Sequence, residues 1–511
     1  MSAPVNSVAN IMLSQAITAL GLDCVAWAGP FGQEHYRMTT AYNEDLAVLS
    51  SWAHNSNELL HLAIGWQRAH YALSKDQADG PSALALTIVV NECPPKFWDS
   101  LHQVQRQGWP LLVILMDEQQ KYLSSAAHHH EHGLSDYAAS LGIYCSEPAE
   151  CHLLSSISQC LHSCLNNKGS VRLAHLIGSN ASTPPSTLFG SQFSWNNFSP
   201  GPYNFPAKEL PGLEAAALLR IANELLSTPS AVALWTRSVH PGPLLKLGQR
   251  LQYCSISGLA WQIAGLVSQH CHPVVFLPSV SIPLLLPELM GLEGCPVTFI
   301  ILDGCCSFYT STGKRQPLAK LHDLALLSSM PDLVLAEPAD EEEARALTAA
   351  LLRWPGLSAV KLMTVPALSV PSTYQTPPLN IGEGRCLRQG QDLAFICLGP
   401  HVNVALLAIE TLRSWGFQAG VYDMRFLQPL DRTLLSEALS AQRIITVEDH
   451  SIRGGLGSKI ADIITASGMS SQIRQFIKVG LDQDFLECDP EDHGISINSL
   501  LQAAQHALEL T

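Results

Sequence analysis

Charged side chains are scarce in this sequence. Only 14% of its 511 residues are Asp, Glu, Lys or Arg, against about 25% in an average globular protein. The 29 basic residues are outnumbered by 44 acidic ones, so the formal net charge is -15. Nucleic-acid binding needs clustered Lys and Arg, and this composition therefore predicts no nucleic-acid partner. A hydrophobic fraction of 47% with so little charge predicts large apolar subunit interfaces.

Long apolar runs and paired cysteines are also missing. The longest strongly apolar runs, such as residues 111–116, are far shorter than the roughly 20 residues of a membrane-spanning helix. Residues 1–10 lack the basic start and apolar core of a secretion signal. The 14 cysteines include no C-x-x-C pair, a pattern that is typical of reduced thiols. These absences predict a soluble, cytoplasmic protein that does not bind a membrane.

Two stretches rich in Pro, Ser, Asn and Gly interrupt the chain. They cover residues 179–211 and 366–384, and the first is predicted to be a linker. At about 100 to 200 residues per domain, the length predicts three domains. We place them at residues 1–178, 212–375 and 376–511, with residues 179–211 as the linker.

Short apolar strands alternate with helix-length amphipathic segments in all three blocks. This alternation predicts parallel sheets covered by helices, so the fold class is α/β with three consecutive doubly wound domains. In the last block Asp431 follows Pro429 and is a predicted helix N-cap. The predicted strands are residues 85–90, 111–116, 231–235, 273–277, 297–302, 393–398, 419–422 and 444–447.

Two phrases in the last block carry a family resemblance. YDMRFLQPLD at residues 422–431 and TVEDHSIRGGLGS at residues 446–458 closely resemble the C-terminal domain of transketolases and 1-deoxy-D-xylulose-5-phosphate synthases. In the second phrase a strand ends in Glu448 and Asp449, and three glycines allow a tight turn into the next helix. We therefore expect changes at Glu448 or Gly455 to harm stability or dimerisation before any activity.

The resemblance extends over most of the chain. MPDLVLAEPAD at residues 330–340 is similar to the pyrimidine-binding domain of this family, and residues 97–101, 110–117 and 136–143 are similar to its diphosphate-binding domain. It implies a transketolase-like architecture of three α/β domains, in which the first two face each other across a two-fold dimer. It also implies thiamine diphosphate and Mg²⁺ as cofactors.

In the family a glutamate contacts the aminopyrimidine ring of thiamine diphosphate and helps to remove the proton from C2. The matching place in this chain holds Ile256 and Ser257, which are the candidate cofactor contacts. No Asp or Glu occurs between Glu224 and Glu288. The usual carboxylate is therefore replaced, and ordinary activation of the cofactor is not expected.

The family holds its metal with a Gly-Asp-Gly motif and a later Asn, and here both places differ. Residues 91–93 read Asn-Glu-Cys, and residues 117–119 read Asp-Glu-Gln. Glu92 with Glu118 remain candidate metal ligands, and Glu92, Glu118 and Gln119 candidate cofactor contacts, because Mg²⁺ prefers oxygen ligands. The alternative is that these side chains are solvated at the ends of strands.

Two histidines are candidate catalytic residues by resemblance to the substrate channel of the family. His54 precedes a predicted helix, and His322 lies near the place of a family histidine loop. The alternative for His54 is a surface or helix-start role. A third group, residues 128–132, reads His-His-His-Glu-His and is predicted to be a solvated loop, because adjacent histidines do not converge easily on one ion.

Three functions remain open from the sequence. The first is a transketolase-like scaffold or partner subunit with a degenerate thiamine diphosphate site, forming a homodimer or a heteromer with a transketolase-like subunit. The alternative is an atypical thiamine diphosphate-dependent transferase of transketolase type, which moves a ketol or acyl unit between small carbonyl substrates. In the third, the cleft that holds the cofactor in the family binds a different small molecule in this chain, through Glu92, His54 or the histidine-rich residues 128–132.

Overall fold

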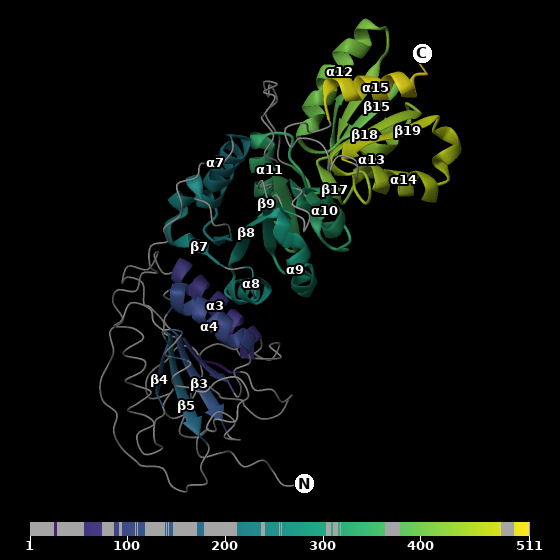
Figure 1. Ribbon diagram of the computed structural model, residues 1–511. Helices are drawn as coiled ribbons and strands as arrows, with labels where there is room; N and C mark the ends of the chain where they lie inside the picture. The colour runs from purple at the N-terminus through teal and green to yellow at the C-terminus, as the bar shows by residue number, and fades with distance from the viewer. Residues whose placement is uncertain are drawn as a thin grey trace. The chain divides into compact units, whose positions relative to one another are not determined.

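The computed structural model (Figure 1) divides into two compact units, residues 1–204 with 257–271, and residues 205–256 with 272–511. Each unit is described by itself. The structure describes residues 25–27, 56–73, 86–90, 95–107, 109, 111–117, 138, 141, 143–146, 171–177, 212–236, 241–254, 256, 258–302, 308–309, 315–316, 318–362, 379–481 and 495–509.

The first unit contains a five-stranded parallel sheet in the order β1-β2-β3-β5-β4. Helices α3 (Ser56–Leu73) and α4 (Pro95–Gln107) pack on it through buried side chains that include Leu60, Phe97 and Leu101. The two predicted strands of this block are confirmed. The strands are β1 Val25–Trp27, β2 Leu86–Val90, β3 Leu111–Asp117, β4 Tyr144–Ser146 and β5 Val171–Ile177.

Helix α8 (Leu259–Val267) also belongs to the first unit, although strands of the second unit precede and follow it. It crosses α3 at close range, because a glycine in each segment faces the other. A Cβ atom at Gly65 would lie 2.0 Å from the carbonyl oxygen of Gln262, and one at Gly258 would lie 2.0 Å from the ring of His61. Any larger residue at either position would push α3 and α8 apart.

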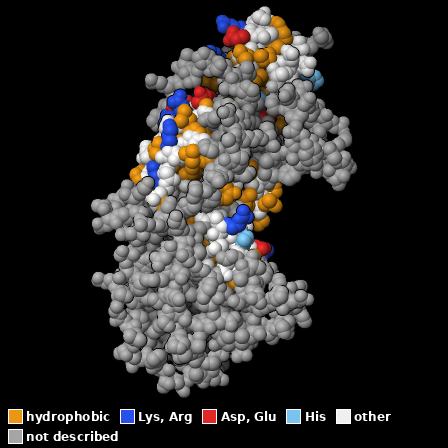
Figure 2. Space-filling model, turned by 60° about the vertical axis from the view of Figure 1, so that its left-hand side comes forward, with side chains coloured by type: hydrophobic (Ala, Val, Ile, Leu, Met, Phe, Trp, Pro, Cys, Tyr) orange, Lys and Arg blue, Asp and Glu red, His pale blue; other side chains and the backbone are white. Residues whose placement is uncertain are grey.

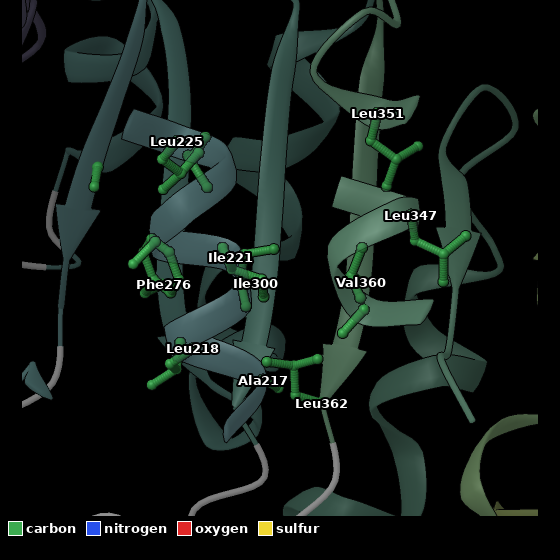
Figure 3. Close-up of a cluster of buried hydrophobic side chains, with 14 of the residues drawn as sticks. Ala217, Leu218, Ile221, Leu225, Phe276, Ile300, Leu347, Leu351, Val360 and Leu362 are labelled. Atoms are coloured by element: carbon green, nitrogen blue, oxygen red, sulfur yellow. The ribbon is translucent and has the colours of Figure 1, made fainter. Parts of the chain in front are cut away.

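The larger sheet of the second unit has seven strands in the order β17-β12-β13-β9-β8-β6-β7. Helices α7 (Gly212–Ser227) and α11 (Glu341–Leu351) cover one face, where Leu218, Ile221 and Leu347 pack against Phe276 and Ile300 of the strands (Figure 3). The strands are β6 Ala231–Trp235, β7 Leu251–Tyr253, β8 His272–Pro278, β9 Val297–Leu302, β12 Val334–Ala336, β13 Leu357–Leu362 and β17 Phe426–Gln428. The other elements are η3 Gly242–Arg250, η4 Ser279–Ser281, α9 Ile282–Leu289, η5 Met290–Leu292, α10 Leu318–Leu327, and the paired strands β10 Phe308–Tyr309 and β11 Arg315–Gln316.

The last sheet has five strands in the order β14-β16-β15-β18-β19, all parallel except β14. Asp431 caps α13 by accepting a hydrogen bond from the amide of Leu434 at 2.9 Å, so the predicted N-cap is confirmed. The strands are β14 Arg385–Arg388, β15 Leu393–Cys397, β16 Ala419–Asp423, β18 Arg443–Ser451 and β19 Gln475–Leu481. The helices are η6 Gly399–His401, α12 Val402–Ser414, α13 Arg432–Leu439, α14 Leu456–Ala466, η7 Met469–Gln472 and α15 Ile497–Ala507.

One strand joins the two sheets of the second unit. β17 lies between β16 and α13 in sequence, yet it pairs antiparallel with β12 at the edge of the seven-stranded sheet. The architecture is α/β with mainly parallel sheets, as predicted. The predicted boundaries at residues 178, 211 and 375 fall outside the described residues and stay predictions. Among the described helices, none has the length and hydropathy needed to cross a membrane.

Candidate functional site

Most of the predicted site residues fall on parts of the chain that are not described. Two of the predicted site residues are described. His322 is a residue of helix α10, and Ile256 lies in a bend between β7 and α8. The predicted roles of both stay predictions. The candidates outside the described residues are His54, Glu92, Glu118, Gln119, Ser257 and the histidine-rich residues 128–132.

The bend at residue 256 is the place where the resemblance puts the cofactor-activating glutamate. The Ile256 side chain is half-buried, and it has no ionisable group. Two residues later, Gly258 adopts a left-handed conformation with φ +65° and starts α8. Since residues 225–287 contain neither Asp nor Glu, this stretch supplies no carboxylate for the aminopyrimidine ring. The degenerate cofactor site stays a prediction, and the side chain described at residue 256 has no carboxylate to contradict it.

A buried chain of polar side chains connects α3, α4 and α8, and no motif in the sequence predicts it. Ser100 donates a hydrogen bond to Oδ1 of Asn57 at 2.7 Å, and it lies 3.1 Å from Nε2 of His61. Because the Ser100 proton points to Asn57, Nε2 of His61 donates to Ser100, and Nδ1 accepts from Gln262 at 3.2 Å. Burial, reinforced by the charge of Arg68, lowers the pKa of His61 to about 4. The imidazole is therefore neutral at pH 7.

This arrangement is structural and does not activate a nucleophile. In a Ser-His catalytic pair the serine donates its proton to the histidine, whereas here the histidine donates to Ser100. Sequence periodicity places His61 on a helix, but it does not reveal a partner 201 residues away. His61 therefore positions helices rather than moving protons.

Next to the candidate His322, Asp323 makes a buried ion pair. Its Oδ1 lies 3.2 Å from Nζ of Lys361, and both side chains are fully buried. Ser279 donates a hydrogen bond to Oδ2 at 2.7 Å, and the Leu324 amide donates to Oδ1 at 2.7 Å. A buried ion pair could have been predicted from Lys361, which is the single charged residue in the apolar strand LSAVKL. A charged side chain inside a buried strand is stable only when an opposite charge or hydrogen bonds compensate it. Asp323 is occupied in packing α10 against β13.

A second buried carboxylate closes the strand-to-helix turn after β18. Glu448 accepts hydrogen bonds from the amides of Leu456 and Gly457, the latter at 2.9 Å, and Nε2 of His450 lies 3.1 Å from its Oε2. The carboxylate thus sits at the positive N-terminal end of α14. The predicted tight turn is confirmed, since Gly454 has φ +79° and Gly455 caps the helix.

A substitution at Gly455 tests this turn. A Cβ atom there would lie 2.1 Å from both Oε2 of Glu448 and Cε1 of His450. We expect Gly455→Ala to lower the free energy of unfolding by about 3 kcal/mol, because it must displace the carboxylate that caps α14. Gly291→Ala is the control, since nothing lies within 4 Å of its Cβ position, and we expect a change below about 0.5 kcal/mol. Urea unfolding followed by circular dichroism measures both, and equal effects would contradict the assignment.

Four charged side chains connect α11 to the last sheet. Oε1 of Glu343 lies 2.6 Å from Nε of Arg425 and 3.2 Å from Nη2 of Arg385, and Arg385 also contacts Asp423 at 2.9 Å. Burial, and then the charge of Asp423, raises the pKa of Glu343 to about 7, although the two guanidinium groups act in the opposite direction. These groups neutralise one another, and their arrangement locks the two sheets together.

No group of three His, Cys, Asp or Glu side chains in the described part of the chain is placed to hold a metal ion. The predicted metal ligands Glu92 and Glu118 lie outside that part, so their role stays a prediction.

Comparison with known proteins agrees with the fold and the motifs. The sequence model of the transketolase C-terminal domain matches residues 382–481. A solved structure of a mutant transketolase from Pichia stipitis superposes with a TM-score of 0.57 at 12% identity, covering 89% of this chain and 81% of that one. The fold of the chain is transketolase-like. The predicted transketolase-like α/β architecture is therefore confirmed.

Relatives of the transketolase-like chain include 1-deoxy-D-xylulose-5-phosphate synthases. The one from Heliobacterium modesticaldum is 30% identical over 191 residues, which is 36% of this chain and 29% of the relative. The one from Anaeromyxobacter dehalogenans is 29% identical over 297 residues, or 55% and 46% of the two chains. The chain thus spans less than half the length of these relatives. Enzymes of this family are in general thiamine diphosphate-dependent.

Proposed function

We propose that the transketolase-like chain is a scaffold or partner subunit that does not carry out ordinary thiamine diphosphate catalysis. The observation that carries the proposal is Ile256 at the place of the activating glutamate, in a stretch without any carboxylate between Glu224 and Glu288. An aliphatic side chain can neither donate to nor accept from the aminopyrimidine nitrogen. A bound cofactor would lack the group that promotes loss of the C2 proton.

The buried ionisable groups described above are already held by other side chains. His61 is neutral, and both of its ring nitrogens face partners within its own helix cluster. Asp323 is held by Lys361, and Glu343 by two arginines. Each of these side chains would have to break a buried contact before it could reach a cofactor, which costs several kcal/mol.

The surface of α9 supports assembly with a partner. The segment Ile282–Leu292 has Glu288 as its one ionisable residue and is otherwise apolar, and such helices are normally buried. Here Leu284 is 74% exposed and Met290 is 64% exposed, beside the exposed Pro283 and Pro287. We propose that a second subunit covers this face in a homodimer or in a heteromer with a transketolase-like subunit. We place this assembly in the cytoplasm, because the scattered cysteines are typical of reduced thiols.

Isothermal titration with thiamine diphosphate, with and without Mg²⁺, tests the proposed function. We expect no binding by the protein alone at micromolar concentrations. Ile256→Glu restores the carboxylate, and Ile256→Gln is its control with the same shape and no charge. Micromolar binding by the unmodified chain, with a matching rise in melting temperature, would overturn the proposal. It would favour the alternative, an atypical transferase that moves a ketol or acyl unit between small carbonyl substrates.

A further inference from the structure

Helix α7 and the turn η3 form one continuous surface of the second unit. Leu218 and Leu225 of α7 and Leu244 and Leu247 of η3 belong to the same buried core. The end of η3 is fixed to the end of α7, because Arg250 donates hydrogen bonds to the carbonyls of Leu225 and Thr228 at 2.9 and 2.7 Å. The outer faces of both elements therefore move together and present a fixed pattern of side chains.

The outer face combines leucines with unpaired cations. Leu219 and Leu226 are each 40% exposed and Leu245 is 50% exposed, next in sequence to the exposed Arg220 and Lys246. Among the described residues, neither Arg220 nor Lys246 has an ion pair or a hydrogen bond. We call these five residues the α7–η3 surface. In Figure 2, basic and hydrophobic side chains lie next to one another on the left of the upper half, with an acidic side chain above them.

The acidic side chain that the structure describes on α7 is turned away from this surface. Glu224, on α7, is directed to α11, where its Oε2 lies 3.2 Å from Nη1 of Arg345. At the described exposed positions of α7 and η3, every ionisable side chain is basic. The chain as a whole carries a net charge of -15, so a positive apolar surface is a local reversal of its charge. Such a reversal steers partners of opposite charge.

We propose that the α7–η3 surface binds an acidic amphipathic helix of a partner protein. Leucines of that helix would pack on Leu219, Leu226 and Leu245, while its carboxylates would pair with Arg220 and Lys246. Two cations are too few for a nucleic-acid site, which needs many phosphate contacts. A second copy is disfavoured at this surface, because it would bring its own Arg220 and Lys246 against the same two cations. The binding surface itself is argued independently of the proposed function. Only the purpose of the binding, assembly with a partner, rests on that proposal.

The probe is a synthetic amphipathic peptide with leucines at helical spacing and glutamates elsewhere, labelled with a fluorophore. The control peptide keeps the leucines and replaces every glutamate with lysine. Fluorescence anisotropy with the full chain should show binding of the acidic peptide at least about tenfold tighter than of the basic one, and the difference should shrink as salt is raised. Equal binding of both peptides, or no binding of either, would overturn the proposal.

Matched variants locate the binding. Arg220→Glu with Lys246→Glu should weaken the acidic peptide at least about tenfold. Arg413→Glu with Arg432→Glu makes the same change in net charge at exposed positions on α12 and α13, and it should leave binding within about twofold. Equal loss in both pairs would overturn the site. If the chain self-associates and only Arg220→Glu with Lys246→Glu abolishes this, the occupant of the surface is a second copy and not a partner helix. If the chain binds anionic vesicles but not the acidic peptide, the occupant is a membrane.

Failure here is distinct from failure of the proposed function. Peptide binding does not involve thiamine diphosphate, and the titration with thiamine diphosphate does not involve α7 or η3. A chain that binds the cofactor and also binds the acidic peptide would keep this surface and lose the scaffold role.

Discussion

Replacing Asp323 with alanine should lower the free energy of unfolding by about 3 to 5 kcal/mol. The substitution leaves the ammonium group of Lys361 fully buried without its carboxylate, which lies 3.2 Å away in the native protein. Ser279 also loses its acceptor. The loss comes from removing the carboxylate that faces a buried ammonium group rather than from the missing volume. Urea unfolding of the full chain, followed by intrinsic fluorescence and circular dichroism, measures it.

Two controls separate charge from packing at this pair. Ser279→Ala removes one neutral donor and should cost only about 1 kcal/mol. The double variant Asp323→Leu with Lys361→Met removes both charges and should recover most of the stability lost in Asp323→Ala, because a buried ion pair contributes little compared with apolar groups of similar size. If the double variant is less stable than Asp323→Ala, the buried charge is not the cause.

Acidification should destabilise the protein through His61. Its pKa is about 4 in the folded protein and about 6.5 when unfolded, so between these values only the unfolded state takes up the proton. The contribution of His61 to stability is complete above pH 6.5 and is lost as the pH falls towards 4. At about 1.4 kcal/mol per pKa unit, the loss reaches about 3 kcal/mol. His272, which contacts Thr298 at 2.9 Å and whose pKa burial also lowers to about 4, adds a loss of the same sign.

The variant His61→Gln isolates this term, because its amide nitrogen can still donate to Ser100 and has no proton to gain. The difference in unfolding free energy between the native chain and this variant, measured at pH 7, 5.5 and 4.5, should change in favour of the variant as pH falls. Glu343 acts in the opposite direction, because its raised pKa gives a contribution that is lost as pH rises through about 7, and the subtraction removes it. A difference that does not change with pH would mean that His61 is not held neutral.

Local patterns were enough to predict the strands at the centres of the sheets. β8, β9 and β15 are apolar runs buried on both faces, and Asp431 follows the ordinary rules for an N-cap. β17 could not be predicted in the same way. It has three residues, and its pairing with β12 depends on how two sheets meet rather than on its own sequence.

At the candidate site, too, some features could be predicted from the sequence and others could not. A missing carboxylate at residue 256 can be read from the sequence directly, because absence of a residue type over a long stretch needs no geometry. The role of His61 could not be read, since its partners Ser100 and Gln262 come from different parts of the chain. Packing of α8 on α3 depends on two glycines whose significance appears only when the helices cross.

The strand β17 also determines where the protein can be divided. The match to the transketolase C-terminal domain begins at residue 382, which invites an excised fragment. Such a fragment would carry β17 away from the middle sheet and leave β12 as an open edge with unpaired backbone amides and carbonyls. It would also take Arg425 away from Glu343 and leave a buried carboxylate exposed on the remaining piece. The start of the family match at residue 382 is therefore not a boundary between two parts that could fold separately.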